Sequence, residues 1–167
     1  MNLAFRPGKP EDLEALTELF RKAIDTMNRN GIPQWDEIYP CREDLAKDIA
    51  QKQLFVGTNE ENRIVVAYVI NRECDPQYRD AHWRDNSGNH RILHRLCVLP
   101  DVQNQGVGTQ TVLHLERQLK EEGITSIRLD AFCQNPYAIS MYEHLGYTTA
   151  GYADLRKGRF ALMEKIL

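Results

Sequence analysis

Residues 96–111, with the sequence LCVLPDVQNQGVGTQT, constrain the fold of this chain more than any other segment. The run opens with apolar, strand-like residues, passes through a turn that contains Gly106 and Gly108, and continues as an amphipathic helical pattern that Gly123 ends. The first N–H groups of a helix have no partner within the helix, and the helix dipole places partial positive charge there. A strand, a glycine turn and a helix in this order therefore predict a site for an anion, typically a phosphate.

The other segments predict the element order βααβββαβαββ. The expected strands are residues 1–6, 54–57, 64–70, 91–99 and 125–132, one further strand, and 160–166; the expected helices begin near residues 10, 42, 108 and 135. Residues 54–57 and 64–70 are the natural partners of a hairpin. No repeat or linker divides the sequence, so we expect a single domain over residues 1–167, with a mixed sheet and helices on its faces.

Composition limits the possible partners. The chain has 167 residues, with 21 basic and 24 acidic side chains and a net charge of 21 − 24 = −3. This balance argues against a nucleic-acid-binding protein with a basic surface, although it leaves room for a small positive pocket. No apolar run approaches the ~18 residues that a membrane helix needs, and no signal peptide is visible at the start. We therefore expect no membrane partner and a cytoplasmic protein.

The cysteine and histidine patterns do not predict a disulfide framework or a metal site. The four cysteines, at positions 41, 74, 97 and 133, include no C-x-x-C pair, which favours reduced thiols. His82, His90 and His94 match no standard zinc spacing, and no paired cysteines accompany them. We expect no metal.

Two common phosphate-binding motifs do not fit the glycine turn. A Walker A loop requires a lysine directly after its last glycine, and here Gly108 is followed by Thr109. A dinucleotide-binding G-x-G-x-x-G motif would require glycine at position 111, which is threonine. The spacing that is present is Gln103-x-x-Gly106-x-Gly108.

This spacing resembles the Q/R-x-x-G-x-G/A acetyl-CoA-binding motif of the GNAT N-acetyltransferase superfamily. A second motif of that family, N-x-x-A-x-x-x-Y-x-x-x-G-F, is similar to the run from Asn135 through Ala138, Tyr142 and Gly146, with Tyr147 in place of phenylalanine. The element order also resembles the family along essentially the whole chain. The resemblance implies an α/β (α+β) fold with a mixed, mostly antiparallel central sheet and helices on both faces. It further implies an acetyl-CoA-dependent N-acetyltransferase.

The resemblance also implies how acetyl-CoA would bind. In the family, backbone amides of the motif hold the pyrophosphate, and the strand before it pairs with the pantetheine arm. The matching motif positions are Gln103, Gln105, Gly106, Val107, Gly108 and Thr109, and the matching strand positions are Leu96, Cys97 and Val98. Main-chain bonds to an extended ligand suit a free strand edge. The alternative is that the glycines only make a tight turn.

Tyr142 matches the family's general acid, which protonates the departing CoA thiolate. The alternative is a core aromatic residue, because Ala138, Tyr142 and Leu145 share one helix face. Asn135 matches a residue that bonds to the cofactor arm, but before Pro136 it is also suited to cap a helix.

The general base, which must take a proton from the attacking ammonium, has no fixed position in the family. His94 is the first candidate, because it lies on the strand before the motif and histidine titrates near neutral pH. A structural histidine is the alternative, and Glu73 and Asp75 are further candidates. On a regular strand His94 and Cys97 point to opposite faces, so we do not expect a Cys–His nucleophilic pair.

The acceptor is expected to be a small-molecule or peptide amine. Trp35 and Tyr39, in the loop between the first two helices, together with Glu73, are the candidate acceptor residues; Trp35 is equally suited to pack beneath the loop. A homodimer is possible by analogy with the family. The competing interpretations are a non-enzymatic acyl-CoA-binding regulatory module and an unrelated phosphate-binding domain.

Overall fold

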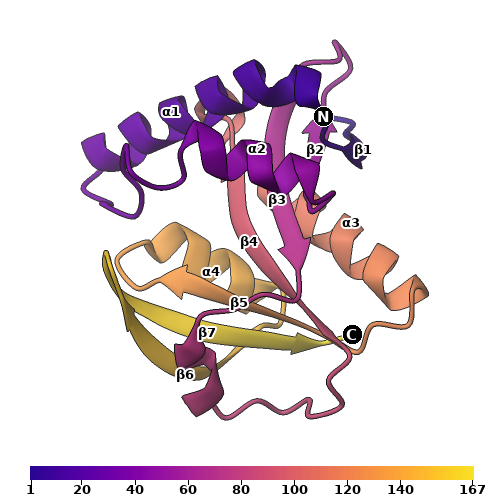
Figure 1. Ribbon diagram of the computed structural model, residues 1–167, viewed down its shortest axis with the longest axis vertical. Coiled ribbons are helices and arrows are strands. Elements are labelled where there is room, and N and C mark those ends of the chain that lie inside the picture. The colour runs from indigo at the N-terminus through magenta and orange to yellow at the C-terminus, as the bar shows by residue number, and fades with distance from the viewer. The chain divides into compact units, whose positions relative to one another are not determined.

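The computed structural model describes all 167 residues and confirms the predicted order of helices and strands. The strands are β1 (Ala4–Pro7), β2 (Leu54–Thr58), β3 (Ile64–Asn71), β4 (His90–Val98), β5 (Ser126–Phe132), β6 (Thr148–Leu155) and β7 (Gly158–Ile166). The α-helices are α1 (Leu13–Arg29), α2 (Arg42–Ala50), α3 (Val107–Glu121) and α4 (Pro136–His144). Short 3-10 turns at Pro10–Asp12, Pro76–Asp80 and Pro100–Val102 complete the chain (Figure 1).

The differences from the predicted boundaries have local causes. The strand predicted over residues 1–6 begins only at Ala4, where pairing with Thr58 of β2 starts. The helix predicted to begin at Pro10 opens as a single 3-10 turn and becomes α-helical at Leu13. The helix predicted to run from about residue 42 to 52 ends at Ala50, because Lys52 has a φ of 57°, in the left-handed region.

The chain divides into two compact units. The first comprises residues 1–70 and 95–111, and the second comprises residues 71–94 and 112–167. The strand order is β1-β2-β3-β4 in the first unit and β4-β5-β7-β6 in the second, so β4 belongs to both. The β1–β2, β2–β3, β5–β7 and β6–β7 pairs are antiparallel, and β4–β5 is parallel. The predicted fold class, a mixed and mostly antiparallel sheet with helices, is confirmed.

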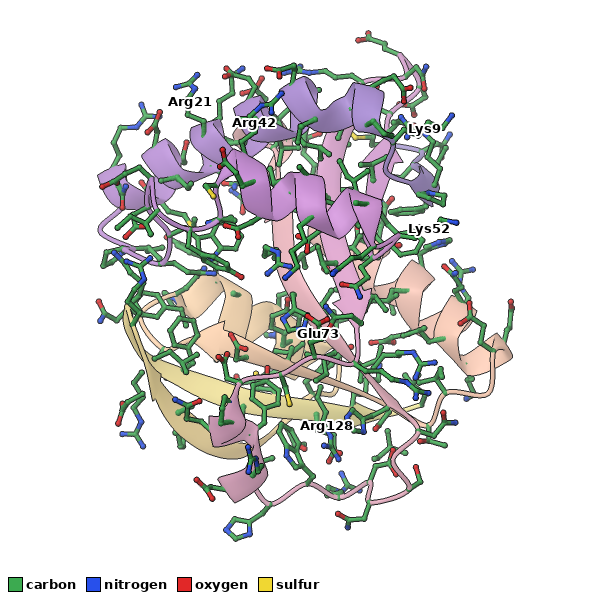
Figure 2. The ribbon with its side chains drawn as sticks, in the orientation of Figure 1. Lys9, Arg21, Arg42, Lys52, Glu73 and Arg128 are labelled. Carbon is green, nitrogen blue, oxygen red and sulfur yellow. The ribbon has the colours of Figure 1, made fainter.

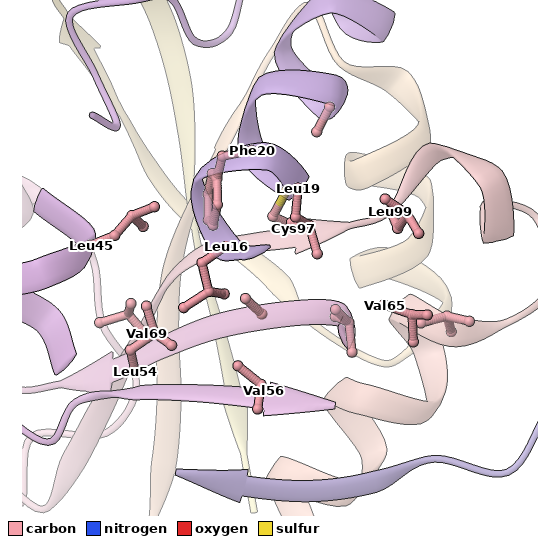
Figure 3. Close-up of a cluster of buried hydrophobic side chains, with 14 of the residues drawn as sticks. Leu16, Leu19, Phe20, Leu45, Leu54, Val56, Val65, Val69, Cys97 and Leu99 are labelled. Atoms are coloured by element: carbon pink, nitrogen blue, oxygen red, sulfur yellow. The ribbon is translucent and has the colours of Figure 1, made fainter. Parts of the chain in front are cut away.

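The core of the first unit forms where α1 and α2 meet strands β2 and β3. Helix α1 is amphipathic, and its buried face carries Leu16, Leu19 and Phe20, at the three- and four-residue spacings of a helix (Figure 3). These side chains pack with Leu45 of α2 and with buried residues of β2, β3 and the end of β4. Helices α1 and α2 lie next to each other across β2 and β3 (Figure 1).

The second unit is built on the hairpin of β6 and β7 and on β5, which pairs with β7 from Ser126 to Phe132. Residues 72–89 form a single 3-10 turn at Pro76–Asp80 and otherwise have no regular secondary structure. The loop is nevertheless held in place, because Tyr78 is 2% exposed and Trp83 packs on it with ring centroids 5.5 Å apart. No helix in the structure combines the length and the apolar character needed to span a membrane.

Candidate active site

The glycine turn connects β4 to α3 through an irregular backbone. After the 3-10 turn at Pro100–Val102, Asn104 and Gly106 adopt φ angles of 62° and 78°, both in the left-handed region. Glycine adopts this conformation without the steric penalty that a Cβ brings, which explains Gly106. No protein atom lies within 4 Å of the position a Cβ would take there, so the turn faces open space.

The turn presents a row of main-chain donors at the start of α3. The N–H of Gln110 donates to the carbonyl of Gly106 over 2.9 Å, and this bond is the first of the helix. The N–H groups of Gly106, Val107, Gly108 and Thr109 therefore have no partner within α3. Val107 is 1% exposed and belongs to the core, which anchors the helix start. Free donors at the positive end of a helix dipole are suited to bind a phosphate.

The predicted pantetheine strand, Leu96–Val98, is the last part of β4 and lies in the first unit. Cys97 is 3% exposed within the core, and burial raises the pKa of its thiol well above the usual value. A thiolate nucleophile is therefore disfavoured, and any contact with a cofactor would use the backbone. The side chain of Gln103 donates to the carbonyl of Val98 over 3.3 Å, which ties the turn to the end of this strand.

Between His94 and Cys97, β4 does not alternate regularly, because Arg95 has a φ of 50°. A left-handed residue within a strand is typical of a β-bulge. Side chains on the two sides of Arg95 therefore do not follow the regular alternation between faces from which His94 and Cys97 were expected to point in opposite directions. The guanidinium of Arg95 makes two hydrogen bonds with Asp48 of α2, at 2.9 Å and 2.7 Å. A third, at 2.5 Å, goes to the hydroxyl of Tyr39.

The two aromatic acceptor candidates have different environments. Trp35 is 9% exposed and packs on Phe20 with ring centroids 5.5 Å apart, so its ring is part of the core. Tyr39 is 37% exposed, and the cation of Arg95 lies 5.7 Å from its ring centroid. The loop is closed by Asp36, whose Oδ1 accepts the N–H groups of Ile38 and Tyr39. Tyr39 is thus the more accessible of the two.

His94, in the second unit, is held by its own strand neighbourhood. Its Nε2 lies 2.8 Å from the side-chain oxygen of Asn71 and 2.8 Å from the backbone carbonyl of Glu73, just beyond the end of β3 (Figure 2). Both partners are acceptors, so Nε2 carries a hydrogen and donates it. The side chain of Glu73 is exposed. His94 therefore connects β4 to the segment after β3 through Nε2, and in this tautomer Nδ1 carries the lone pair.

Tyr142 is a buried residue of α4. It is 7% exposed, and its ring meets Tyr147 edge-on at 5.4 Å between centroids. Burial raises the pKa of the Tyr142 phenol well above its usual value, and the negative charge of Asp130 raises it further. The phenol is therefore neutral at physiological pH and able to donate a proton. Asn135 caps α4, because its Oδ1 accepts the N–H of Ala138 over 3.2 Å.

Asp130 of β5 is a candidate that the sequence analysis missed. Its Oδ2 accepts a hydrogen bond of 2.6 Å from the hydroxyl of Tyr78, and its charge acts on Tyr142. The β4–β5 pairing ends at Leu93 and Leu129, whereas β5 continues to Phe132, so Asp130 directly follows the last residue of β5 that pairs with β4. The available signal was an acidic residue on the polar face of the alternating strand TSIRLDAF.

The predicted site residues thus fall into two groups. The glycine turn, Leu96–Val98, Trp35 and Tyr39 belong to the first unit, and His94, Glu73, Asn135 and Tyr142 belong to the second. Within the second unit, Tyr78 and Asp130 are joined by a hydrogen bond, and the charge of Asp130 raises the pKa of the Tyr142 phenol. No group of three or more His, Cys, Asp and Glu side chains is arranged to hold a metal ion. All four cysteines are free thiols.

Comparison with known proteins extends these observations. A family model described as the acetyltransferase (GNAT) family matches residues 16–147. The S-(2-succino)cysteine N-acetyltransferase of Bacillus subtilis (strain 168) is 24% identical over 169 residues, which cover 99% of this chain and 96% of that protein.

Solved structures agree on the fold. A GNAT-family acetyltransferase from Streptococcus agalactiae 2603 has a TM-score of 0.85 at 19% identity, covering 99% of this chain and 95% of that one. The PaiA N-acetyltransferase of Thermoplasma acidophilum, solved in complex with coenzyme A, has a TM-score of 0.74 at 21% identity, with 100% of both chains covered. Since the family model spans most of the sequence, from within α1 to the residue after Gly146, this chain belongs to the GNAT family and is an N-acetyltransferase.

Proposed function

We propose that this protein uses acetyl-CoA to acetylate a primary amine by direct transfer, without an acetylated enzyme intermediate. The observation that carries the proposal is the start of α3, where four consecutive N–H groups from Gly106 to Thr109 have no partner within the helix. This arrangement fits the pyrophosphate of a CoA thioester, and it needs no basic side chain. It is therefore compatible with a net charge of −3.

The reaction requires one bond to form and one to break. The neutral amine attacks the thioester carbonyl, the new N–C bond forms, and the C–S bond breaks to release the CoA thiolate. We assign protonation of that thiolate to Tyr142, whose buried phenol keeps its proton at neutral pH. Asn135, which caps the helix that carries Tyr142, sets where that helix begins.

We assign removal of the amine proton to Asp130. A carboxylate attracts an ammonium group and accepts its proton, and Asp130 lies close enough to Tyr142 for its charge to act on the phenol. His94 is the second candidate base, because its Nδ1 keeps a lone pair when Nε2 donates a hydrogen bond. Asp130 of β5 and Tyr142 of α4 then act as base and acid.

We infer an amino-acid-like acceptor as the first class to test and a peptide N-terminus as the second. The support is the Bacillus subtilis relative, whose name gives the amino acid S-(2-succino)cysteine as its acceptor. Of the acceptor candidates from the sequence, Tyr39 and Glu73 are accessible, whereas Trp35 contributes to the core. We therefore propose Tyr39 and Glu73 as the side chains available to the acceptor.

The experiment is a screen of amino acids, S-substituted cysteines, polyamines and short peptides with acetyl-CoA. Release of free thiol is followed in a colorimetric assay, and mass spectrometry identifies the acetylated amine. We expect thiol release that depends on the amine, with one acetyl group added per thiol released. Thiol release that is independent of every amine, or an acetyl group found on the enzyme, would contradict direct transfer.

A further inference from the structure

The long loop between β3 and β4, residues 72–89, is held against the second unit by a buried acid. Glu164 of β7 is 2% exposed, and its two carboxylate oxygens accept the backbone N–H groups of Arg84 and Asp85, at 2.8 Å and 3.2 Å. A buried carboxylate needs such partners, since burying it without hydrogen bonds is strongly unfavourable. Glu164 thus fixes the backbone of the loop at one point.

A second set of contacts surrounds Asp85. One of its carboxylate oxygens, Oδ2, accepts hydrogen bonds of 2.6 Å from both Thr125 and Ser126 at the start of β5. Arg128 of β5, labelled in Figure 2, donates to the backbone carbonyl of Asp85 over 2.6 Å. The same guanidinium lies 4.4 Å from the ring centroid of Trp83. The loop is therefore attached to β5 through side chains as well as backbone.

Trp83 connects the anchored part of the loop to Tyr78. Its indole Nε1–H donates to the backbone carbonyl of Tyr78 over 2.7 Å, and the two rings pack on each other. Tyr78 is 2% exposed, so its ring has little freedom to move. Its hydroxyl donates to Oδ2 of Asp130 over 2.6 Å, 52 residues further along the chain. The anchored loop is therefore bonded to the carboxylate whose charge acts on Tyr142.

We propose that Tyr78 is a positioning residue for the acetyl-transfer reaction, holding the Asp130 carboxylate in the orientation in which it receives the acceptor amine. This inference rests on the proposed function. A tyrosine is suited to this role, because its rigid ring fixes the position of the hydroxyl group. A hydrogen bond to a charged group is also about twice as strong as one between neutral groups.

The surroundings of the pair keep Tyr78 a donor. Burial, the charge of Asp130 and the hydrogen bond to it raise the pKa of the Tyr78 phenol far above its usual value. The other titratable or charged groups that act on these residues are Asp75 and Cys74 from the loop, Arg128 from β5 and Tyr142 from α4. Tyr78 therefore keeps its hydrogen throughout the physiological pH range, and the bond to Asp130 persists.

The test is the variant Tyr78→Phe, which removes one oxygen atom and leaves the ring that Trp83 contacts. We expect kcat to fall about tenfold, while KM for acetyl-CoA stays within a factor of about two, since a hydrogen bond to a charged group is lost. We also expect the acidic limb of the kcat/KM profile to move to higher pH, because a carboxylate that loses a donor takes up a proton more readily. Tyr152→Phe, an exposed tyrosine of β6, is the matched control and should match wild type.

Two further variants separate the possible outcomes. Trp83→Phe loosens the loop but retains the Tyr78 hydroxyl, so it should lower the melting temperature without the shift in the pH profile. If it reproduces that shift, Tyr78 is only a structural residue and the inference is wrong. If Asp130→Asn loses activity but Tyr78→Phe keeps wild-type kcat and pH profile, the inference fails while the proposed function stands. If wild type acetylates no amine, both fail together.

Discussion

Arg95 and Asp48 form a nearly buried, two-pronged ion pair between the bulge of β4 and helix α2. The two hydrogen bonds measure 2.9 Å and 2.7 Å, and the side chains are only 13% and 6% exposed. The φ of 50° at Arg95 is unfavourable for a residue with a Cβ and costs about 1–2 kcal/mol. The ion pair and the hydrogen bond from Arg95 to Tyr39 form in this conformation and offset its cost.

Removing one partner of this pair should be strongly destabilising. We expect Asp48→Leu and Arg95→Met each to lower the free energy of unfolding by about 3 kcal/mol, because each leaves a buried charge without its partner. The double variant should lose less than the sum of the two, since no unpaired charge remains. Urea denaturation with a shared m-value measures all three.

The exposed ion pair of Arg21 with Glu18 provides the comparison for this experiment. Both side chains are at least half exposed, so Arg21→Ala should change the free energy of unfolding much less than the variants at Asp48 and Arg95 do. If the variants at Asp48 and Arg95 behave like Arg21→Ala, the buried pair does not stabilise the bulge.

Gly106 and Gly123 allow a matched test of the glycine turn. Both have φ angles near 80°, and neither has a protein atom within 4 Å of the position for a Cβ. Gly106→Ala and Gly123→Ala should therefore lower stability by a similar amount, about 1 kcal/mol. Only Gly106→Ala places a methyl group in the open space at the start of α3, so only it should raise KM for acetyl-CoA, by about tenfold.

Calorimetric titration with CoA gives an independent reading of the same comparison. The affinity of Gly106→Ala should fall and that of Gly123→Ala should match wild type. Equal affinities for the two variants would mean that the glycine turn does not bind the cofactor.

The decrease in the free energy of unfolding at low pH should depend on Asp85. Burial works against ionisation of this carboxyl, but hydrogen bonds from Ser126 and Thr125 outweigh it and lower its pKa below the usual value. A carboxyl with a lowered pKa contributes stability above its ordinary pKa, near 4, and loses that contribution as the pH falls. The slope of unfolding free energy against pH below pH 4 should therefore be smaller in Asp85→Asn than in wild type.

The control for Asp85→Asn is Glu37→Gln, at an exposed carboxylate in the loop between α1 and α2. Since Glu37→Gln also removes one carboxylate but leaves the hydrogen bonds of Asp85 in place, the slope of Asp85→Asn is compared with its slope. An unchanged slope in Asp85→Asn would show that its hydrogen bonds do not favour the charged form.

The sequence predicted most of the fold because its elements carry their own signals. The β-branched run at residues 64–70 and the apolar face of residues 13–29 specify a strand and a helix from local pattern alone. The bulge at Arg95 had no such signal, because no rule for a single residue favours arginine in the left-handed region. The side chain at this position is bonded to Asp48, 47 residues away, a contact that local sequence does not reveal.

Only those residues of the candidate site that belong to a sequence motif could be predicted from the sequence. The glycine turn and Tyr142 follow from spacing, whereas Asp130 is one acidic residue on the polar face of a strand, without a motif. Its partner Tyr78 lies in a loop without periodicity, and the bond between them depends on how Glu164 and Arg128 hold that loop. The sequence indicates the chemistry that is available, and tertiary contacts decide which groups act together.

The most direct test of the account is a kinetic comparison of Tyr142→Phe with Tyr147→Phe. Both are buried tyrosines whose rings are in contact, and Tyr147 has no assigned role in proton transfer. We predict that Tyr142→Phe lowers kcat by about a hundredfold and leaves KM for acetyl-CoA nearly unchanged, because it removes only the proton donor. Tyr147→Phe should keep the wild-type kcat. A wild-type kcat in Tyr142→Phe, or a loss of acetyl-CoA binding in its place, would contradict the assignment of Tyr142 as the general acid.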